Sequence, residues 1–287
     1  MDRKRVRARP TIATLGPFLL FALAASCGAP RINLPSGSGT PSPDATAAYG
    51  EAVRECRAAK TLSASLSLSG RAGSSKLSAR VDAGFSEPGR LRLEGYPRIN
   101  FGGKPFFVLV ANGMDATLVL TRDGRVLRGA APAAIIEALA GIALEPDEMR
   151  ALVGGCALDS GEAADGRSYG SGWISVANGQ STVFLRQIEN HWRVAGLRRG
   201  SLVVEYSEFT GGYPATVHLH TTVSSSVAAA DLTIRVSQRE VNVSLGNAVF
   251  SVDVPKDATP LTLEELRRAG PLGGTTEGTE GALRKPS

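Results

Sequence analysis

Residues 61–85 read TLSASLSLSGRAGSSKLSARVDAGF, in which apolar and polar side chains alternate. Successive side chains of a β-strand point to opposite faces, so this period of two predicts two strands with one apolar face each. A turn at residues 73–75 (GSS) separates them. The apolar face carries Leu62, Ala64, Leu66, Leu68, Leu77, Ala79, Val81, Ala83 and Phe85. The stretch therefore predicts an antiparallel sheet, around which the rest of the chain is interpreted.

The alternation continues to residue 129 through RLRLEG, PFFVLVA, MDATLVLT and RVLRG. Asn112 and Gly113 form a strong hairpin signal because both residues tolerate a positive φ. Residues 61–129 thus predict a six-stranded meander. Residues 159–172 are polar and rich in glycine, and we expect a loop there. Strands resume over residues 173–245 at short intervals, and FSVDVP (residues 250–255) closes the pattern.

Four helical segments interrupt or flank the strands. Asp44 is a candidate N-cap for a helix that precedes the sheet. Residues 132–139 and 146–153 predict two short helices that each begin with proline. A capping box at residues 262–265 predicts a further short helix that ends at Gly270. The two middle helices carry more apolar surface than they can cover alone, so we expect a lid on the sheet, formed by Ile135, Ile136, Leu139, Met149 and Leu152.

The first 26 residues have the features of a secretory signal: five basic residues, then a short apolar run and small residues. Residues 23–28 (LAASCG) resemble a bacterial lipobox, which implies that Cys27 carries lipid. The alternative is an ordinary cleavable signal with an incidental cysteine. Residues 27–43 are rich in Pro, Gly and Ser and predict a lipidated N-terminus with a flexible tether. Residues 44–270 then form one domain, and residues 271–287 a disordered tail.

The chain has three cysteines. If Cys27 carries lipid, Cys56 and Cys156 remain as an even pair in an oxidising compartment. A bridge between them closes a loop of about 100 residues, which the chain-entropy model values at about 4.7 kcal/mol. Two free thiols or a catalytic cysteine are the alternatives.

Charge and motifs exclude several function classes. Beyond residue 26 there are 27 basic and 26 acidic residues, so the basic isoelectric point does not indicate nucleic-acid binding. No catalytic signature occurs, and we expect neither an enzyme nor a cofactor. His218 and His220 face the same side of a strand, as metal ligands could. Because no third ligand is evident nearby, we interpret both as surface histidines and expect no metal site.

This order of elements resembles the LolA/LolB lipoprotein-carrier superfamily. The resemblance rests on residues 61–70 with 77–95, on EPDEMRALVGG (residues 145–155) and on FSVDVP. It implies a mainly β, α+β fold: an incomplete antiparallel β-barrel (half-barrel) lidded by short helices, whose hollow accepts acyl chains. It further implies a membrane-inserting loop with Ile99 and Phe101 as candidate residues.

The same resemblance implies an outer-membrane lipoprotein that faces the periplasm. Its partners would be the membrane, through its N-terminal lipid, the acyl chains of lipoproteins or lipids, and a periplasmic carrier protein. The alternative is a structural or sensory lipoprotein with a filled core that binds a protein partner. Small inward residues such as Ala79 leave room for a cavity, yet protein interiors normally close to high density. The sequence leaves both readings open.

Overall fold

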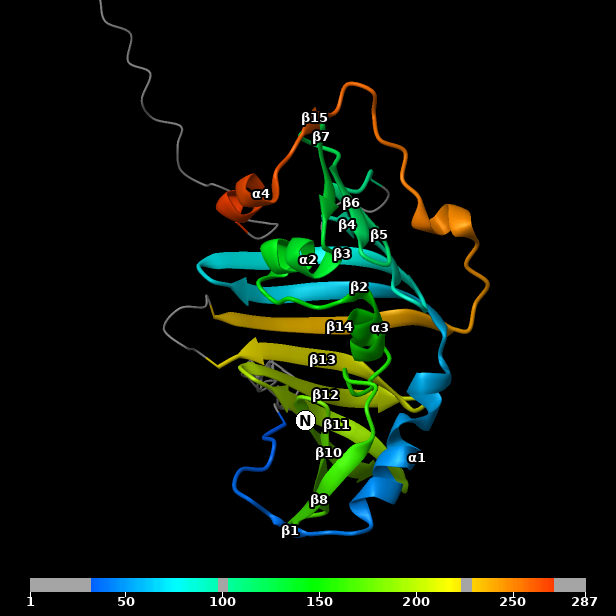
Figure 1. Cartoon of the computed structure of the whole chain (residues 1–287), viewed down its shortest axis with the longest axis vertical. Helices are drawn as coiled ribbons and strands as arrows, with labels where there is room; N and C mark the ends of the chain where they lie inside the picture. The colour runs from blue at the N-terminus through cyan, green and yellow to red at the C-terminus, as the bar shows by residue number, and fades with distance from the viewer. Residues whose placement is uncertain (1–31, 98–102, 223–228, 271–287) are drawn as a thin grey trace, which may run out of the picture. The chain divides into compact units, whose positions relative to one another are not determined.

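The computed structural model describes residues 32–97, 103–222 and 229–270. The fold below is that of these residues. They form one sheet of 15 strands in the order β1-β8-β9-β10-β11-β12-β13-β14-β2-β3-β4-β5-β6-β7-β15 (Figure 1). The two ends of this order do not pair with each other, so the sheet is open. The predicted half-barrel is confirmed.

The predicted meander is also confirmed. It consists of β2 (Thr61–Ala72), β3 (Ser75–Ser86), β4 (Arg90–Tyr96), β5 (Phe107–Asn112), β6 (Asp115–Leu120) and β7 (Arg125–Ala130). The second half of the sheet consists of β8 (Ala163–Tyr169), β9 (Trp173–Asn178), β10 (Ser181–Ile188), β11 (His191–Arg199), β12 (Leu202–Thr210), β13 (Tyr213–Thr221) and β14 (Ala230–Val241). The last strand of this second half, β14, pairs antiparallel with the first long strand, β2, and so joins the halves.

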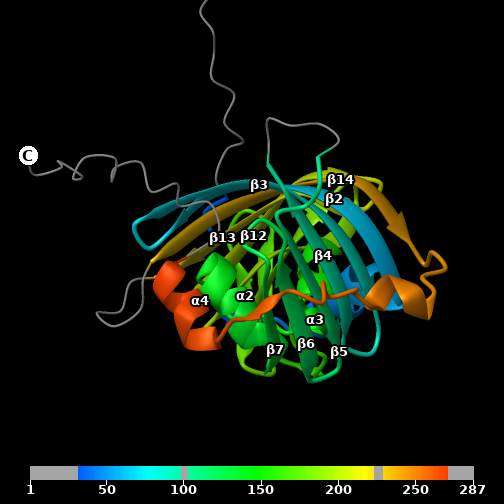
Figure 2. The same cartoon turned by 90° about the horizontal axis from the view of Figure 1, so that it is seen from above.

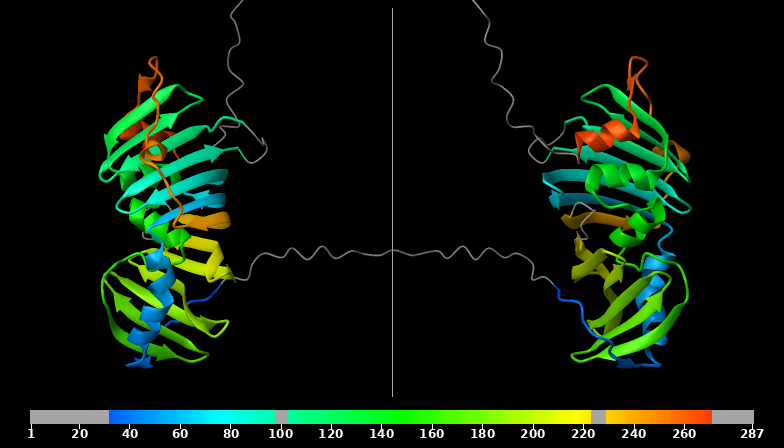
Figure 3. Two further views of the ribbon diagram at one scale, coloured as in Figure 1. Left: turned by 90° about the vertical axis from the view of Figure 1, so that its right-hand side faces the viewer. Right: turned by 60° about the vertical axis from the view of Figure 1, so that its left-hand side comes forward.

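Strand register explains where the core lies. Along β2 and β3, Leu62 lies opposite Phe85 and Leu66 lies opposite Val81, so the apolar residues of both strands share one face. Those four side chains are buried. Figures 2 and 3 show that the sheet is curved. The apolar face of β2 and β3 belongs to the main hydrophobic core.

Four helices accompany the sheet: α1 (Ala45–Ala58), α2 (Pro132–Ala140), α3 (Pro146–Val153) and α4 (Leu263–Ala269). The apolar stripe of α1 packs mainly on β11 and β8. Helices α2 and α3 lie on the concave side of the sheet, and α4 packs beside α2 (Figure 2). The predicted capping box of α4 is present, between Thr262 and Glu265. Among the described residues, no helix combines the length and apolar character that crossing a bilayer requires.

Two expectations about irregular segments were wrong. Residues 163–169 are not a loop but strand β8, which pairs with β9 and with the two-residue strand β1 (Thr40–Pro41). Gly166 permits this approach, because a Cβ atom there would lie 2.3 Å from the carbonyl oxygen of Ser42. Residues 250–255 are not a strand: Phe250 ends the short 3-10 helix η1 (Asn247–Phe250) and packs on the outer face of β5. The two-residue strand β15 (Thr259–Pro260) follows and pairs with β7.

Part of the segment expected to be a flexible tether packs on the sheet. Leu34 is buried against Phe184 and Val203 on the outer face of the sheet. The guanidinium of Arg198 donates hydrogen bonds to the carbonyl oxygens of Leu34 and Pro35, at 3.1 and 2.8 Å. Packing of two apolar side chains, Ile32 and Leu34, therefore orders a segment whose Pro, Gly and Ser content is typical of a flexible linker.

Candidate functional site

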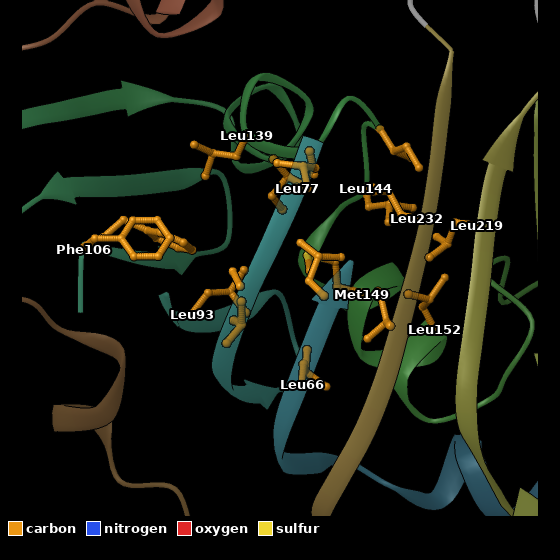
Figure 4. A pocket seen from close by; sticks show the side chains of 18 residues that line it. Leu66, Leu77, Leu93, Phe106, Leu139, Leu144, Met149, Leu152, Leu219 and Leu232 are labelled. Carbon is orange, nitrogen blue, oxygen red and sulfur yellow. The ribbon is translucent and has the colours of Figure 1, made fainter. Parts of the chain in front are cut away.

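A cavity lies between the concave face of the sheet and helices α2 and α3 (Figure 4). The sheet contributes side chains from β2, β3, β4, β5, β13 and β14, and residue 106 comes from just before β5. All 18 lining residues are apolar: Leu66, Leu68, Leu77, Ala79, Val81, Leu93, Phe106, Phe107, Ile136, Leu139, Ala140, Ile142, Leu144, Met149, Leu152, Leu219, Leu232 and Ile234. Because no lining side chain offers a hydrogen bond or a charge, this cavity suits hydrocarbon and excludes a polar head group.

The cavity volume is about 100 Å³. An apolar cavity of about 150 Å³ is enough for one benzene molecule, so the space here takes only a few carbon atoms. A complete acyl chain therefore fits only if part of the wall moves.

Four of the five predicted lid residues line the cavity: Ile136 and Leu139 on α2, and Met149 and Leu152 on α3. The fifth, Ile135, is fully buried but lies outside the lining. Helix period explains the difference, since adjacent positions on a helix point about 100° apart. The connection between α2 and α3 adds Ile142 and Leu144, which are buried as well.

Helix α3 is held by polar links from both halves of the sheet. Asp147 accepts a hydrogen bond from the backbone N–H of Gly89 (3.0 Å), and Arg150 donates to the carbonyl oxygen of Ala59 (2.6 Å). Glu148 pairs with Arg199 of β11. Burial disfavours that guanidinium charge, yet the hydrogen bond and charge of Glu148 raise the pKa of Arg199 above its usual value.

A covalent link follows α3 directly. Cys156 and Cys56 of α1 form a disulfide with their Cα atoms 5.6 Å apart. The hydroxyl of Tyr206, on β12, donates to the carbonyl oxygen of Cys156 at 2.9 Å. The end of α3 is thus tied to α1 and to the sheet.

Helix α2 is attached by a weaker link. Its Glu137 pairs with Arg267 of α4 at 3.1 Å, and both side chains are about half exposed. Exposed ion pairs of this kind contribute little, about 0–1 kcal/mol. Helix α2 is therefore held mainly by its buried apolar side chains, whereas α3 also has polar links and the disulfide beside it.

Three predicted site residues, Cys27, Ile99 and Phe101, lie outside the described residues. Phe106, five residues after Phe101 in the sequence, lines the cavity. Its ring contacts that of Phe107 edge-on, with the centroids 5.2 Å apart.

The prediction that His218 is a surface histidine with no third ligand nearby was wrong. Its side chain is only 12% exposed and lies between two carboxylates. Nδ1 is 2.8 Å from Oε2 of Glu205 on β12, and Nε2 is 2.7 Å from Oδ1 of Asp231 on β14. The hydrogen bond with Glu205 raises the pKa of His218; burial opposes this, and Asp231 adds to the rise. Both carboxylates are 13 residues from His218, so only the strand register could have revealed them.

No family model matches the sequence, and no curated protein sequence matches it. Among solved structures, a LolA superfamily protein from Nitrosomonas europaea aligns over 72% of this chain and 97% of its own, with 9% identity and a TM-score of 0.48. A DUF1329 family protein from Desulfovibrio piger aligns over 73% and 98%, with 14% identity and a TM-score of 0.46. The lipoprotein LppX from Mycobacterium tuberculosis aligns over 71% and 99%, with 8% identity and a TM-score of 0.30. The chain is similar to these proteins in the arrangement of its strands and helices; at these values the similarity carries no information about ligand or activity.

Proposed function

We propose that this protein is a lipid-anchored protein of the bacterial cell envelope that binds acyl chains between its sheet and helices α2 and α3. The observation that supports this most is the cavity lining, in which every side chain is apolar. Burial of each methylene group contributes about 0.8 kcal/mol, so even half of a fatty-acid chain gains several kcal/mol there. The head group stays at the cavity mouth, in water or against a membrane.

In this proposal, an acyl chain binds when helix α2 moves away from the sheet. The present cavity of about 100 Å³ is too small for an acyl chain. Helix α2 makes an exposed ion pair, whereas α3 is held by partly buried polar links and the disulfide. Movement of α2 away from the sheet exposes Leu139 and Leu77, which the incoming chain then covers. The apolar surface exposed by opening is thus buried again by the ligand.

A filled-core lipoprotein that binds a protein partner is the second candidate. The small volume favours it, because ligand pockets usually measure about 300–1,000 Å³. The two candidates differ in one measurable property, namely whether the protein takes up a free fatty acid.

A fluorescence titration separates them. The Cys27→Ala chain is purified from detergent-free extract and titrated with the polyene fatty acid cis-parinaric acid. We expect saturable binding at one site per molecule, displaced by palmitate, and acyl lipids released on denaturation and detected by mass spectrometry. Absence of both lipid and uptake would establish the filled-core alternative.

The anchor is proposed to be a lipid on Cys27. The residue after it is Gly28, not the Asp that usually retains lipoproteins at the inner membrane. We therefore expect the protein at the outer membrane, facing the periplasm. We expect Cys27→Ala to move the protein to the soluble periplasmic fraction and to abolish labelling by an alkyne fatty acid, while Ser26→Ala leaves both unchanged. Unaltered membrane fractionation of Cys27→Ala would contradict lipidation.

Transfer of lipoproteins to the membrane is proposed to need the loop that carries Ile99 and Phe101. If these side chains insert into a bilayer, the double change to Glu should abolish transfer without lowering the melting temperature. If they instead cap the core, the double change should lower the melting temperature markedly, because it buries two unpaired charges.

A further inference from the structure

A cluster of carboxylate and imidazole groups lies on the convex face of the sheet, on the side opposite the acyl cavity. We propose that Glu205, His218 and His220 form a binding site for a divalent transition-metal ion such as Zn²⁺. This site is separate from the proposed acyl-binding function and does not depend on it.

Strand register assembles the three ligands. Glu205 of β12 is the cross-strand partner of His218 on β13, so the two side chains share a face. His220 lies two residues further along β13 and therefore points to the same side. One ligand atom from each of the three residues can be chosen so that all lie within 4.8 Å of one another. The alternate residue Leu219 points the other way, into the acyl cavity.

The distances lie close to those of a metal centre. Imidazole nitrogen and carboxylate oxygen bind Zn²⁺ at about 2.0–2.2 Å in a tetrahedral arrangement, which places neighbouring ligand atoms roughly 3.5 Å apart. Nδ1 of His218 and Oε2 of Glu205 are 2.8 Å apart and share one proton. An ion that replaces this proton requires them to separate by less than 1 Å. The two imidazole rings already lie near each other, with centroids 5.1 Å apart and planes tilted by 30°.

Asp231 supplies the support that a metal-binding histidine usually has. Its Oδ1 is 2.7 Å from Nε2 of His218, so it accepts the proton of that nitrogen and leaves Nδ1 as the ligand. A carboxylate hydrogen-bonded to the far nitrogen is the usual way in which a metal-bound imidazole is oriented. Asp231 comes from a third strand, β14, so it fixes the ring from the side opposite to Glu205.

The environment fits an ion with one open position. Glu205 is 8% exposed, so its carboxylate has lost most of its water and gains from a nearby cation. The cluster opens into a pocket of about 370 Å³, whose rim includes Asn33 of the packed N-terminal segment and Thr221. Three protein ligands and access from solvent leave the fourth position for water or for a group on another molecule.

Calorimetry with zinc chloride tests this site on the full chain carrying Cys27→Ala, purified without a histidine tag. The change removes the one cysteine outside the disulfide, and the chain contains only three histidines. We expect one Zn²⁺ per molecule. His218→Ala and His220→Ala should each weaken binding at least 100-fold, and Asp231→Asn 10- to 100-fold. The matched control is His191→Ala, at the start of β11 and next to Glu51, which should bind as the parent does.

A second measurement avoids dependence on how the variants fold. X-ray absorption at the zinc edge of the loaded parent chain should show two imidazole nitrogens and oxygen ligands in the first shell. Failure to bind Zn²⁺, binding that His191→Ala removes, or a first shell without imidazole would each overturn the proposal. Fatty-acid uptake should be the same in His220→Ala and in the parent, which separates failure of this site from failure of the acyl-binding proposal.

Discussion

Filling the cavity with one larger side chain tests the acyl-binding proposal most directly. Ala79 lies on β3 opposite Leu68, is 6% exposed and lines the cavity. The change Ala79→Leu adds three carbon atoms. By comparison with a benzene molecule in about 150 Å³, a space of about 100 Å³ takes three or four carbons, so the new atoms fit.

The expected effect on stability follows from this fit. Three additional buried carbons contribute up to about 2 kcal/mol. For a protein of this size, that corresponds to a rise in melting temperature of roughly 4–8 °C. Because these atoms fill the part of the acyl site that is already open, fatty-acid uptake should be weakened. Calorimetric melting and titration with cis-parinaric acid measure the two effects on one preparation.

The matched control makes the same change away from the cavity. Ala116 on β6 is 4% exposed, lies opposite the fully buried Ala111, and is not part of the cavity lining. Ala116→Leu should therefore overpack the core and lower stability by about 1–3 kcal/mol. If Ala79→Leu is destabilised to the same extent, the space described here is not available. If Ala79→Leu keeps its uptake, the acyl chain binds elsewhere, and the proposal is refuted.

Three further outcomes are expected. Changing both Cys56 and Cys156 to Ala should lower the free energy of unfolding by up to about 4.7 kcal/mol. Thiol counting on the unreduced, denatured Cys27→Ala chain should find no free cysteine, and any free thiol would contradict the disulfide. The hydrogen bonds of Glu265 with Thr262 and Arg125 lower its pKa from 4.5 to about 2, so its contribution to stability is complete above pH 4.5 and is lost as the pH falls toward 2. The melting temperature of Glu265→Gln should thus lie below that of wild type at neutral pH and converge with it near pH 2, and a gap independent of pH would argue against this ion pair. Leu34→Ala should lower the free energy of unfolding by about 2–3 kcal/mol and make the N-terminal segment susceptible to the broad-specificity protease proteinase K. Unchanged resistance would show that Arg198 alone holds the segment.

The meander and the helices could be predicted from the sequence because their signals are local. The alternation in residues 61–85 determines which face of β2 and β3 is apolar, independently of the remainder of the chain. Asn112 and Gly113 favour the hairpin between β5 and β6. Proline at the start of α2 and α3, and the capping box of α4, likewise act within a few residues. The half-barrel architecture and most of the cavity lining followed from these patterns together with the resemblance to a known superfamily.

Features decided by contacts between distant residues could not be predicted in this way. Strand β8 is polar and contains Gly166, and it becomes a strand because β9 and the backbone near Ser42 offer hydrogen-bonding partners. The segment around Leu34 has the composition of a linker, and only the apolar outer face of β10 and β12 gives its two apolar side chains somewhere to pack.

The histidine cluster shows the same limit most clearly. His218 and His220 are close in sequence, but Glu205 and Asp231 reach them only because β12 and β14 pair with β13 in one particular register. A shift of that register by one residue would turn Glu205 to the other face of the sheet. The sequence by itself determined which face each residue of a strand shares with its near neighbours. The tertiary structure alone decided which strands lie side by side, because that depends on packing the whole apolar face and not on any single segment.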